Sequence, residues 1–190
     1  MSIQERLYTV DDVWQLSQLP ENELKQFYLI DGELFWDMPP GYAHGNLAGH
    51  IFRYLLNYAE AHDLGDGSVE SGYYPPDDRR TLLAPDVAFV RKRDVPPANH
   101  AQFVPRMPDL AVEISSPSNT VAELRRKAEV YLANGTELVW LALPERVGVE
   151  VWRMGPDGEP ATEFVARDGS LTGEPVLPGF SLDLQRLFSS

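Results

Sequence analysis

Two apolar stretches of this chain each contain a carboxylate, and this pattern limits how the chain can fold. Asp86 begins the apolar run of "LLAPDVAFV" (residues 82–90), and Glu113 lies inside that of "PDLAVEISSPS" (residues 108–118). Burying an ionised carboxylate costs several kcal/mol unless a partner compensates its charge. The fold must therefore supply a cation, a shared proton or hydrogen-bond donors to both side chains.

Side-chain alternation predicts the face of each strand on which these carboxylates lie. Consecutive residues of a strand point to opposite faces. The bulky apolar residues of the two runs take the face opposite to the carboxylates: Val87, Phe89, Leu110, Val112 and Ile114. If the two strands are neighbours, Asp86 and Glu113 repel each other, and a cation or a shared proton must relieve the repulsion. Oxygen ligands from separate strands, with positions left for water, suit Mg²⁺ or Mn²⁺.

The segment "TVAELRRKAEVYLANG" (residues 120–135) predicts a helix directly after the second run. Thr120 and Glu123 have capping-box spacing, and Asn134-Gly135 is a stop signal. Lys127 lies at the edge of the apolar arc, about 40° from Tyr131. Its stem can follow the sheet while its ammonium reaches the carboxylates. Such a lysine can orient a water molecule or stabilise a charged transition state; a Lys–Glu ion pair without chemistry is the alternative.

The remaining pattern predicts an α+β fold, in which a mixed sheet has one helix before and one after its central strands. In "FYLIDGELFWDM" (residues 27–38), Asp31-Gly32 is a type I′ turn signal and indicates a β-hairpin. The other expected elements are helices in 9–19 and 43–65, two strands within 68–90, a strand in 109–116, a hairpin from 136–144 and 148–154, a β-rich tail in 162–180 and a helical turn in 182–188. A single domain is expected over residues 1–190.

The composition limits which binding partners and which cellular compartment are expected. The chain has no cysteine, so disulfides and thiolate metal sites are excluded. We expect a cytoplasmic protein, because neither a signal peptide nor an apolar run of bilayer length is apparent. The net charge of −13 argues against loose binding to nucleic acid or to an anionic membrane. Residues 79–127 nevertheless hold nine Lys and Arg against five acids, a net charge of +4, which fits either a functional basic surface or a solvated basic face.

A set of segments in a fixed order resembles the Uma-type endonuclease family, within the PD-(D/E)XK or restriction-endonuclease-like superfamily. The segments are "FYLIDGEL", "PDVAFV", "PDLAVEISSPS", "RRKAEVYLANG", "LVWLALPERVGVEVWR" and "LPGFSLDLQRLF". The resemblance extends from Val10 to Phe188. It implies a mixed β-sheet core flanked by helices, with an N-terminal β-hairpin and a β-rich C-terminal tail. It also implies a metal-dependent phosphodiesterase site.

Carried over to this sequence, the resemblance implies that Asp86 and Glu113 bind Mg²⁺ or Mn²⁺ and that Lys127 assists the attacking water. The superfamily lysine normally lies two residues after the second acid, where this chain has Ser115. In the Uma-type branch the lysine has moved to the following helix, fourteen residues after the second acid, and Lys127 has that spacing.

Further positions are candidates for substrate or accessory roles. His44 matches a histidine that is common in the family, and Glu33 follows the hairpin turn. Glu123 occupies a position where the family often has aspartate, although it can equally be only the capping partner of Thr120. Tyr28 occupies a position where the family often has glutamate, and a tyrosine cannot replace a carboxylate ligand. Arg125 and Arg126, with the basic residues 91–93, are candidates to hold phosphates.

We therefore expect a Mg²⁺-dependent endonuclease that hydrolyses phosphodiester bonds in DNA. A homodimer is expected because cutting both strands needs two sites, with Phe35 and Trp36 of the hairpin as a possible contact. The alternative is a catalytically inactive protein with a nuclease fold that acts in binding or as a scaffold, which Tyr28 and the net charge favour. A third reading is a metal-dependent hydrolase of a small phosphodiester, which suits the acidic exterior.

Overall fold

A six-stranded mixed sheet forms the centre of the fold. The structure is a computed structural model that describes residues 6–117 and 119–188. The strand order is β3-β4-β5-β6-β7-β8. Neighbouring strands are antiparallel except β5 and β6, which are parallel. The strand bounds are β3 (Gly65–Val69), β4 (Val87–Arg91), β5 (Leu110–Ile114), β6 (Leu138–Leu143), β7 (Gly148–Met154) and β8 (Pro160–Ala166).

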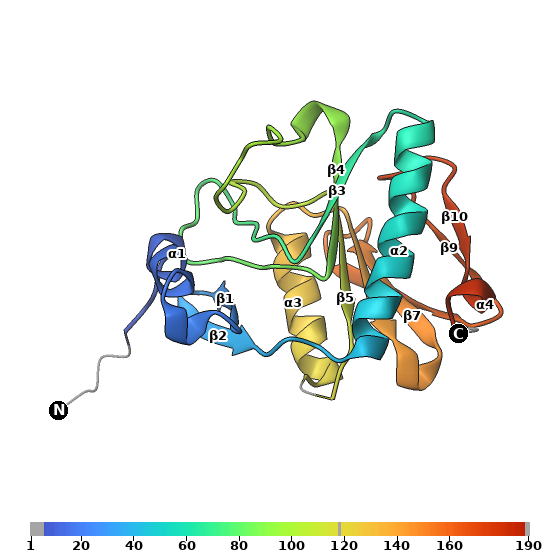
Figure 1. The fold of residues 1–190 in the computed structure, drawn as a ribbon. Coiled ribbons are helices and arrows are strands. Elements are labelled where there is room, and N and C mark those ends of the chain that lie inside the picture. The colour runs from blue at the N-terminus through green and yellow to red at the C-terminus, as the bar shows by residue number, and fades with distance from the viewer. Residues whose placement is uncertain (1–5, 118, 189–190) are drawn as a thin grey trace.

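The two long helices cover opposite faces of this sheet. Helix α3 (Val121–Ala133) lies on one face and α2 (Tyr42–Ala61) on the other, as Figure 1 shows. The short elements β9 (Ser170–Thr172), β10 (Ser181–Asp183) and α4 (Leu184–Leu187) lie on the α2 side. Helix α3 is the connection between the parallel strands β5 and β6, which need a long crossover rather than a tight turn.

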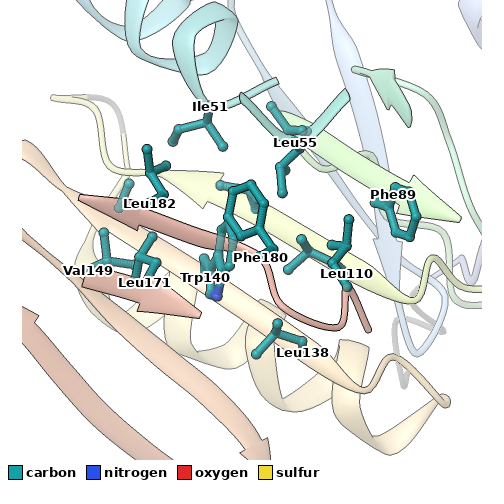
Figure 2. Packing of buried hydrophobic residues seen from close by; sticks show 14 of the residues in the cluster. Ile51, Leu55, Phe89, Leu110, Leu138, Trp140, Val149, Leu171, Phe180 and Leu182 are labelled. Carbon is teal, nitrogen blue, oxygen red and sulfur yellow. The ribbon is translucent and has the colours of Figure 1, made fainter. Parts of the chain in front are cut away.

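The larger core lies between α2 and the sheet. In Figure 2, Phe180 and Leu182 from the C-terminal segment pack among Trp140 of β6 and Ile51 and Leu55 of α2. The bulky residues of β4 and β5 point into this core: Val87, Phe89, Leu110, Val112 and Ile114. Their smaller neighbours, Ala88 and Ala111, face α3 instead. The predicted alternation of faces is therefore confirmed in both strands.

A second core lies between α3 and the sheet, and the N-terminal hairpin, which packs beside α3, carries a third and smaller one. The hairpin is formed by β1 (Gln26–Ile30) and β2 (Glu33–Asp37), and α1 (Val10–Ser17) precedes it. Asp31 and Gly32 have positive φ angles of 55° and 84°, as the predicted type I′ turn requires. One face of the hairpin packs on α1, while Tyr28, Ile30 and Phe35 on the other face belong to the cluster around α3.

The predicted fold class is confirmed, with two differences in the segment before and at the start of β4. The segment 68–90 was expected to contain two strands, but β3 begins earlier, at Gly65, and ends at Val69. Asp86 stands just before β4 rather than inside it. Within the long connection from 70 to 86, isolated bridges join Tyr73 to Leu83 and join Leu82 to Leu29 of the N-terminal segment. No helix within the described residues is both long and apolar enough to cross a membrane.

Candidate functional site

Asp86 and Glu113 lie next to the end of the β4–β5 pairing. The antiparallel register ends with the pair Val87 and Val112, so Asp86 directly precedes one paired residue and Glu113 directly follows the other. The Oδ2 atom of Asp86 accepts a hydrogen bond of 2.7 Å from the backbone N–H of Ile114, which fixes its orientation. Both carboxylates line one pocket.

Helix α3 brings two polar side chains onto Glu113. Lys127 and Tyr131 are four residues apart, so they lie on the same face of the helix. The Tyr131 hydroxyl donates to Oε1 of Glu113 at 2.9 Å, and the Lys127 ammonium lies 3.4 Å from Oε2. Only 4% of Glu113 and 7% of Lys127 are exposed, so this ion pair is almost completely removed from water.

Burial determines the electrostatics of the pair. Loss of hydration and, less strongly, the negative charge of Asp86 raise the pKa of Glu113 to about 7, against the opposing effects of the Lys127 charge and of the Tyr131 hydrogen bond. Burial by itself lowers the pKa of Lys127, but the negative charges of Glu113 and Asp37 outweigh burial and raise it above its usual value. Lys127 therefore stays protonated at neutral pH, whereas Glu113 can exchange a proton there.

His44, in the first turn of α2, supports Asp86 from the other side. Its Nε2 atom lies 3.3 Å from Oδ2 of Asp86 and 3.2 Å from the carbonyl oxygen of Ile114. Both neighbours are acceptors, so Nε2 carries the hydrogen. Burial lowers the pKa of His44, but the hydrogen bond to Asp86 and the charge of Asp86 outweigh burial and raise it overall.

The hairpin contributes two residues that had not been predicted as a pair. Oδ2 of Asp37 lies 3.5 Å from the Lys127 ammonium, and the centre of the Tyr28 ring lies 4.3 Å from it. Neither Asp37 nor Tyr131 was identified as a site residue from the sequence. The two-residue turn fixes Asp37 on the same face as Tyr28, but only the packing of the hairpin on α3 reveals that this face meets Lys127.

Other predicted candidates lie outside the pocket or have structural partners. Glu33 is exposed and pairs with Arg126 at 3.4 Å, beside the pocket rather than in its wall. Arg125 binds the buried carboxylate of Glu150, on β7, at 3.0 Å. Glu123 accepts hydrogen bonds from the backbone N–H and the hydroxyl of Thr120, which completes the capping box. It also lines a hollow next to Lys127.

The basic residues 91–93 stand at the far end of β4, about 16 Å along the strand from Asp86. Arg91 pairs with Asp109 at 2.8 Å and also with Glu137. Lys92 pairs with Asp63, and Arg93 contacts Asp94 at 3.1 Å. These charges compensate local acids and do not extend to the pocket.

The chemistry of the donors fits a hard divalent cation. Among the described residues, no group of three or more His, Asp or Glu side chains is arranged to hold a metal. Asp86 and Glu113 instead supply two carboxylates, and the side chain of Asp86 is 16% exposed to the pocket. Mg²⁺ is commonly bound through one or two carboxylates, with water and substrate oxygens in its remaining positions. The residues present therefore fit Mg²⁺ or Mn²⁺ better than a metal that needs an all-protein ligand cage.

Comparisons with known proteins agree with this fold. A model of the Uma2 family, described as "Putative restriction endonuclease", matches residues 13–185. The comparison with curated proteins found no match. Among solved structures, a crystal structure of a putative nuclease belonging to DUF820 from Anabaena variabilis matches with a TM-score of 0.77. It is 20% identical in sequence, and the match covers 95% of this chain and 97% of that one.

Proposed function

Because this chain belongs to the Uma2 family, described as "Putative restriction endonuclease", we propose that it is a cytoplasmic, divalent-metal-dependent endonuclease that hydrolyses phosphodiester bonds in DNA. The observation that carries the proposal is that Asp86 and Glu113, which adjoin the last paired residues of β4 and β5, line one pocket. A protonated lysine beside these carboxylates, in the same pocket, is the second element that such chemistry needs.

Asp86 and Glu113 would hold Mg²⁺ or Mn²⁺. Bound there, such a cation lowers the pKa of a water molecule and offsets the charge of the phosphate. The Ile114 N–H and His44 hold the Asp86 carboxylate, and Tyr131 holds that of Glu113. Lys127 would donate a hydrogen bond to the attacking water or to a phosphate oxygen as negative charge develops. In hydrolysis the water oxygen joins the phosphorus, the bond to one sugar oxygen breaks, and that oxygen takes up a proton.

The test is cleavage of plasmid and of short duplex DNA with Mg²⁺ or Mn²⁺, compared with EDTA. Asp86→Ala and Glu113→Ala should each abolish cleavage and weaken Mn²⁺ binding in calorimetric titration. Asp63→Asn is a matched control, since it removes an exposed carboxylate whose partner is Lys92. Cleavage that survives in both alanine variants would overturn the proposal.

A binding or scaffold protein derived from a nuclease is the second candidate. Tyr28, at a position where the family often has glutamate, and the net charge of −13 favour it. The same two assays separate the candidates. A scaffold without a metal site would not bind Mn²⁺ in the titration and would not cleave either DNA substrate.

We also propose that the active form is a homodimer, because breaking both strands of a duplex needs two sites. The hairpin offers exposed apolar surface for such a contact, since Trp36 and Met38 are each 51% exposed. Sedimentation of the protein at micromolar concentration should give twice the mass of the chain, and Trp36→Glu should give the monomer. A wild-type protein that sediments as a monomer contradicts this part of the proposal.

A further inference from the structure

The Lys127 ammonium has two carboxylate partners, and only one of them belongs to the proposed metal ligands. Oε2 of Glu113 lies 3.4 Å from it and Oδ2 of Asp37 lies 3.5 Å from it. The side chains differ in environment, because 5% of Glu113 is exposed and 31% of Asp37 is. Lys127 therefore bridges a buried carboxylate in the sheet and a partly hydrated carboxylate in the hairpin.

The hairpin is built so that one face reaches Lys127. In its register Tyr28 pairs with Phe35, and Gln26 pairs with Asp37. Directly paired residues share a face, and residues two apart along a strand share it too. Tyr28 and Asp37 are therefore neighbours on the face that packs on α3. Together they offer the ammonium one aromatic ring and one carboxylate, both of which favour a cation.

A second partner of Lys127 matters because Glu113 cannot fully compensate the charges of Lys127 and of a divalent cation at the same time. When its negative charge is shared with a divalent cation, its attraction for Lys127 falls, and the two positive charges repel each other. Lys127 must then compete for Glu113, leave toward solvent, or be held by another anion. Asp37 is an anion already in contact with Lys127, and it lies outside the proposed pair of metal ligands.

We propose that Asp37 is a positioning residue that retains Lys127 in the pocket when Glu113 binds a divalent cation. This inference rests on the proposed function. Asp37 acts through Lys127, and it neither binds the cation nor touches the reacting atoms. The Tyr28 ring limits the space into which the lysine can move, so its position is fixed by the hairpin and not only by the sheet.

The decisive experiment is a double-mutant cycle on Mn²⁺ affinity, measured by calorimetry at 0.15 M salt. Salt screens partly buried charges only weakly, so the Lys127→Met background is needed to report the direct attraction between Asp37 and the ion. Asp37→Asn alone should raise the Kd for Mn²⁺ about tenfold, the range found when groups behind metal ligands are removed. In a Lys127→Met background the same change should raise the Kd no more than about threefold. A tenfold loss of Mn²⁺ affinity in both backgrounds would show that Asp37 binds the ion itself. No loss of affinity in either background would show that Asp37 does not position Lys127. Both results overturn the inference.

Cleavage gives the second readout. Asp37→Asn should lower kcat about tenfold with KM for DNA unchanged, and Asp37→Glu should recover most of kcat because it keeps the charge. The matched control Asp63→Asn, which disrupts the Lys92–Asp63 pair at the other end of β4, should behave as the wild type.

Urea unfolding of each variant verifies that it is folded. If wild-type protein binds Mn²⁺ and cleaves DNA while Asp37→Asn equals it, only this inference fails. If wild-type protein does neither, the proposed function fails and this inference fails with it.

Discussion

Glu113 is an acidic side chain that is almost completely buried, so its contribution to the stability of the folded protein should depend on pH. Burial raises its pKa in the folded protein to about 7 from an ordinary value of 4.5. The folded state therefore keeps the proton longer than the unfolded state, and the free energy of unfolding falls as pH rises from about 4.5 to about 7. The full decline corresponds to about 3 kcal/mol.

Glu113→Gln imitates the protonated side chain, so it should remove this decline. We expect the variant to match the wild type near pH 4.5 and to be more stable by about 3 kcal/mol at pH 8. Urea unfolding in EDTA at pH 5, 6, 7 and 8 measures the difference. Stability curves that run parallel across this range would show that Glu113 titrates normally.

Tyr131 makes a separate contribution at the same carboxylate. Tyr131→Phe removes the hydroxyl that donates to Oε1 of Glu113, so a buried acceptor loses a partner. We expect a loss of about 1–3 kcal/mol at pH 8, and a smaller loss at pH 5, where Glu113 is protonated. Tyr42→Phe is a suitable control because Tyr42 is 86% exposed. Equal losses at both pH values would contradict the assigned hydrogen bond to a carboxylate.

At the scale of the element, α3 carries both Lys127 and Tyr131, and its first turn is closed by Thr120 and Glu123. The sequence predicted this helix, its capping box and its stop at Asn134-Gly135, because all three signals are local. It left open whether Glu123 serves only the cap. The contacts of Glu123 with Thr120 support the cap.

The two roles of Glu123 can be separated by substitution. Thr120→Ala should cost about 1 kcal/mol of stability in urea unfolding, since the first turn loses a capping oxygen. Glu123→Gln should keep both stability and DNA cleavage, because glutamine can also reach back to the N-cap backbone. A Glu123→Gln variant that folds normally but no longer cleaves DNA would show that its charge acts in the site.

At the scale of the whole molecule, the net charge of −13 and the pairing of the basic residues affect how a nucleic acid can bind. Arg125, Arg126 and residues 91–93 each contact an acidic side chain. These residues therefore do not form a continuous basic surface for a long duplex, although the sequence suggested them as phosphate contacts.

We expect DNA binding to depend only weakly on salt. With one or two phosphates contacted near Lys127, a plot of the logarithm of the binding constant against that of the salt concentration should have a slope of about −1 to −2. Fluorescence anisotropy with labelled duplexes in Ca²⁺, between 50 and 200 mM salt, measures it. A slope near −5 would mean that several further phosphates are held by basic residues.

The sequence by itself determined most of the elements and the faces of the strands, although it extended a helix to Gly65, where the structure begins β3. The hairpin turn, the capping box of Thr120 and Glu123 and the alternation around Glu113 follow from residues within a few positions of one another, where backbone geometry and side-chain period decide the outcome. Lys127 could also be placed on the sheet side of its helix, because helical period is local. The family resemblance added the order of these segments along the chain.

Only the tertiary structure decided which side chains meet. The pairing of β4 with β5 brings Asp86 and Glu113 into one pocket, and the packing of the hairpin on α3 brings Asp37 and Tyr28 to Lys127. The tertiary structure also pairs Arg125 with Glu150 on the distant strand β7. Such contacts join residues that are far apart in sequence, and their geometry depends on how bulky side chains pack between layers. Local sequence carries no record of that packing, so the partner of each charge became evident only from the folded chain.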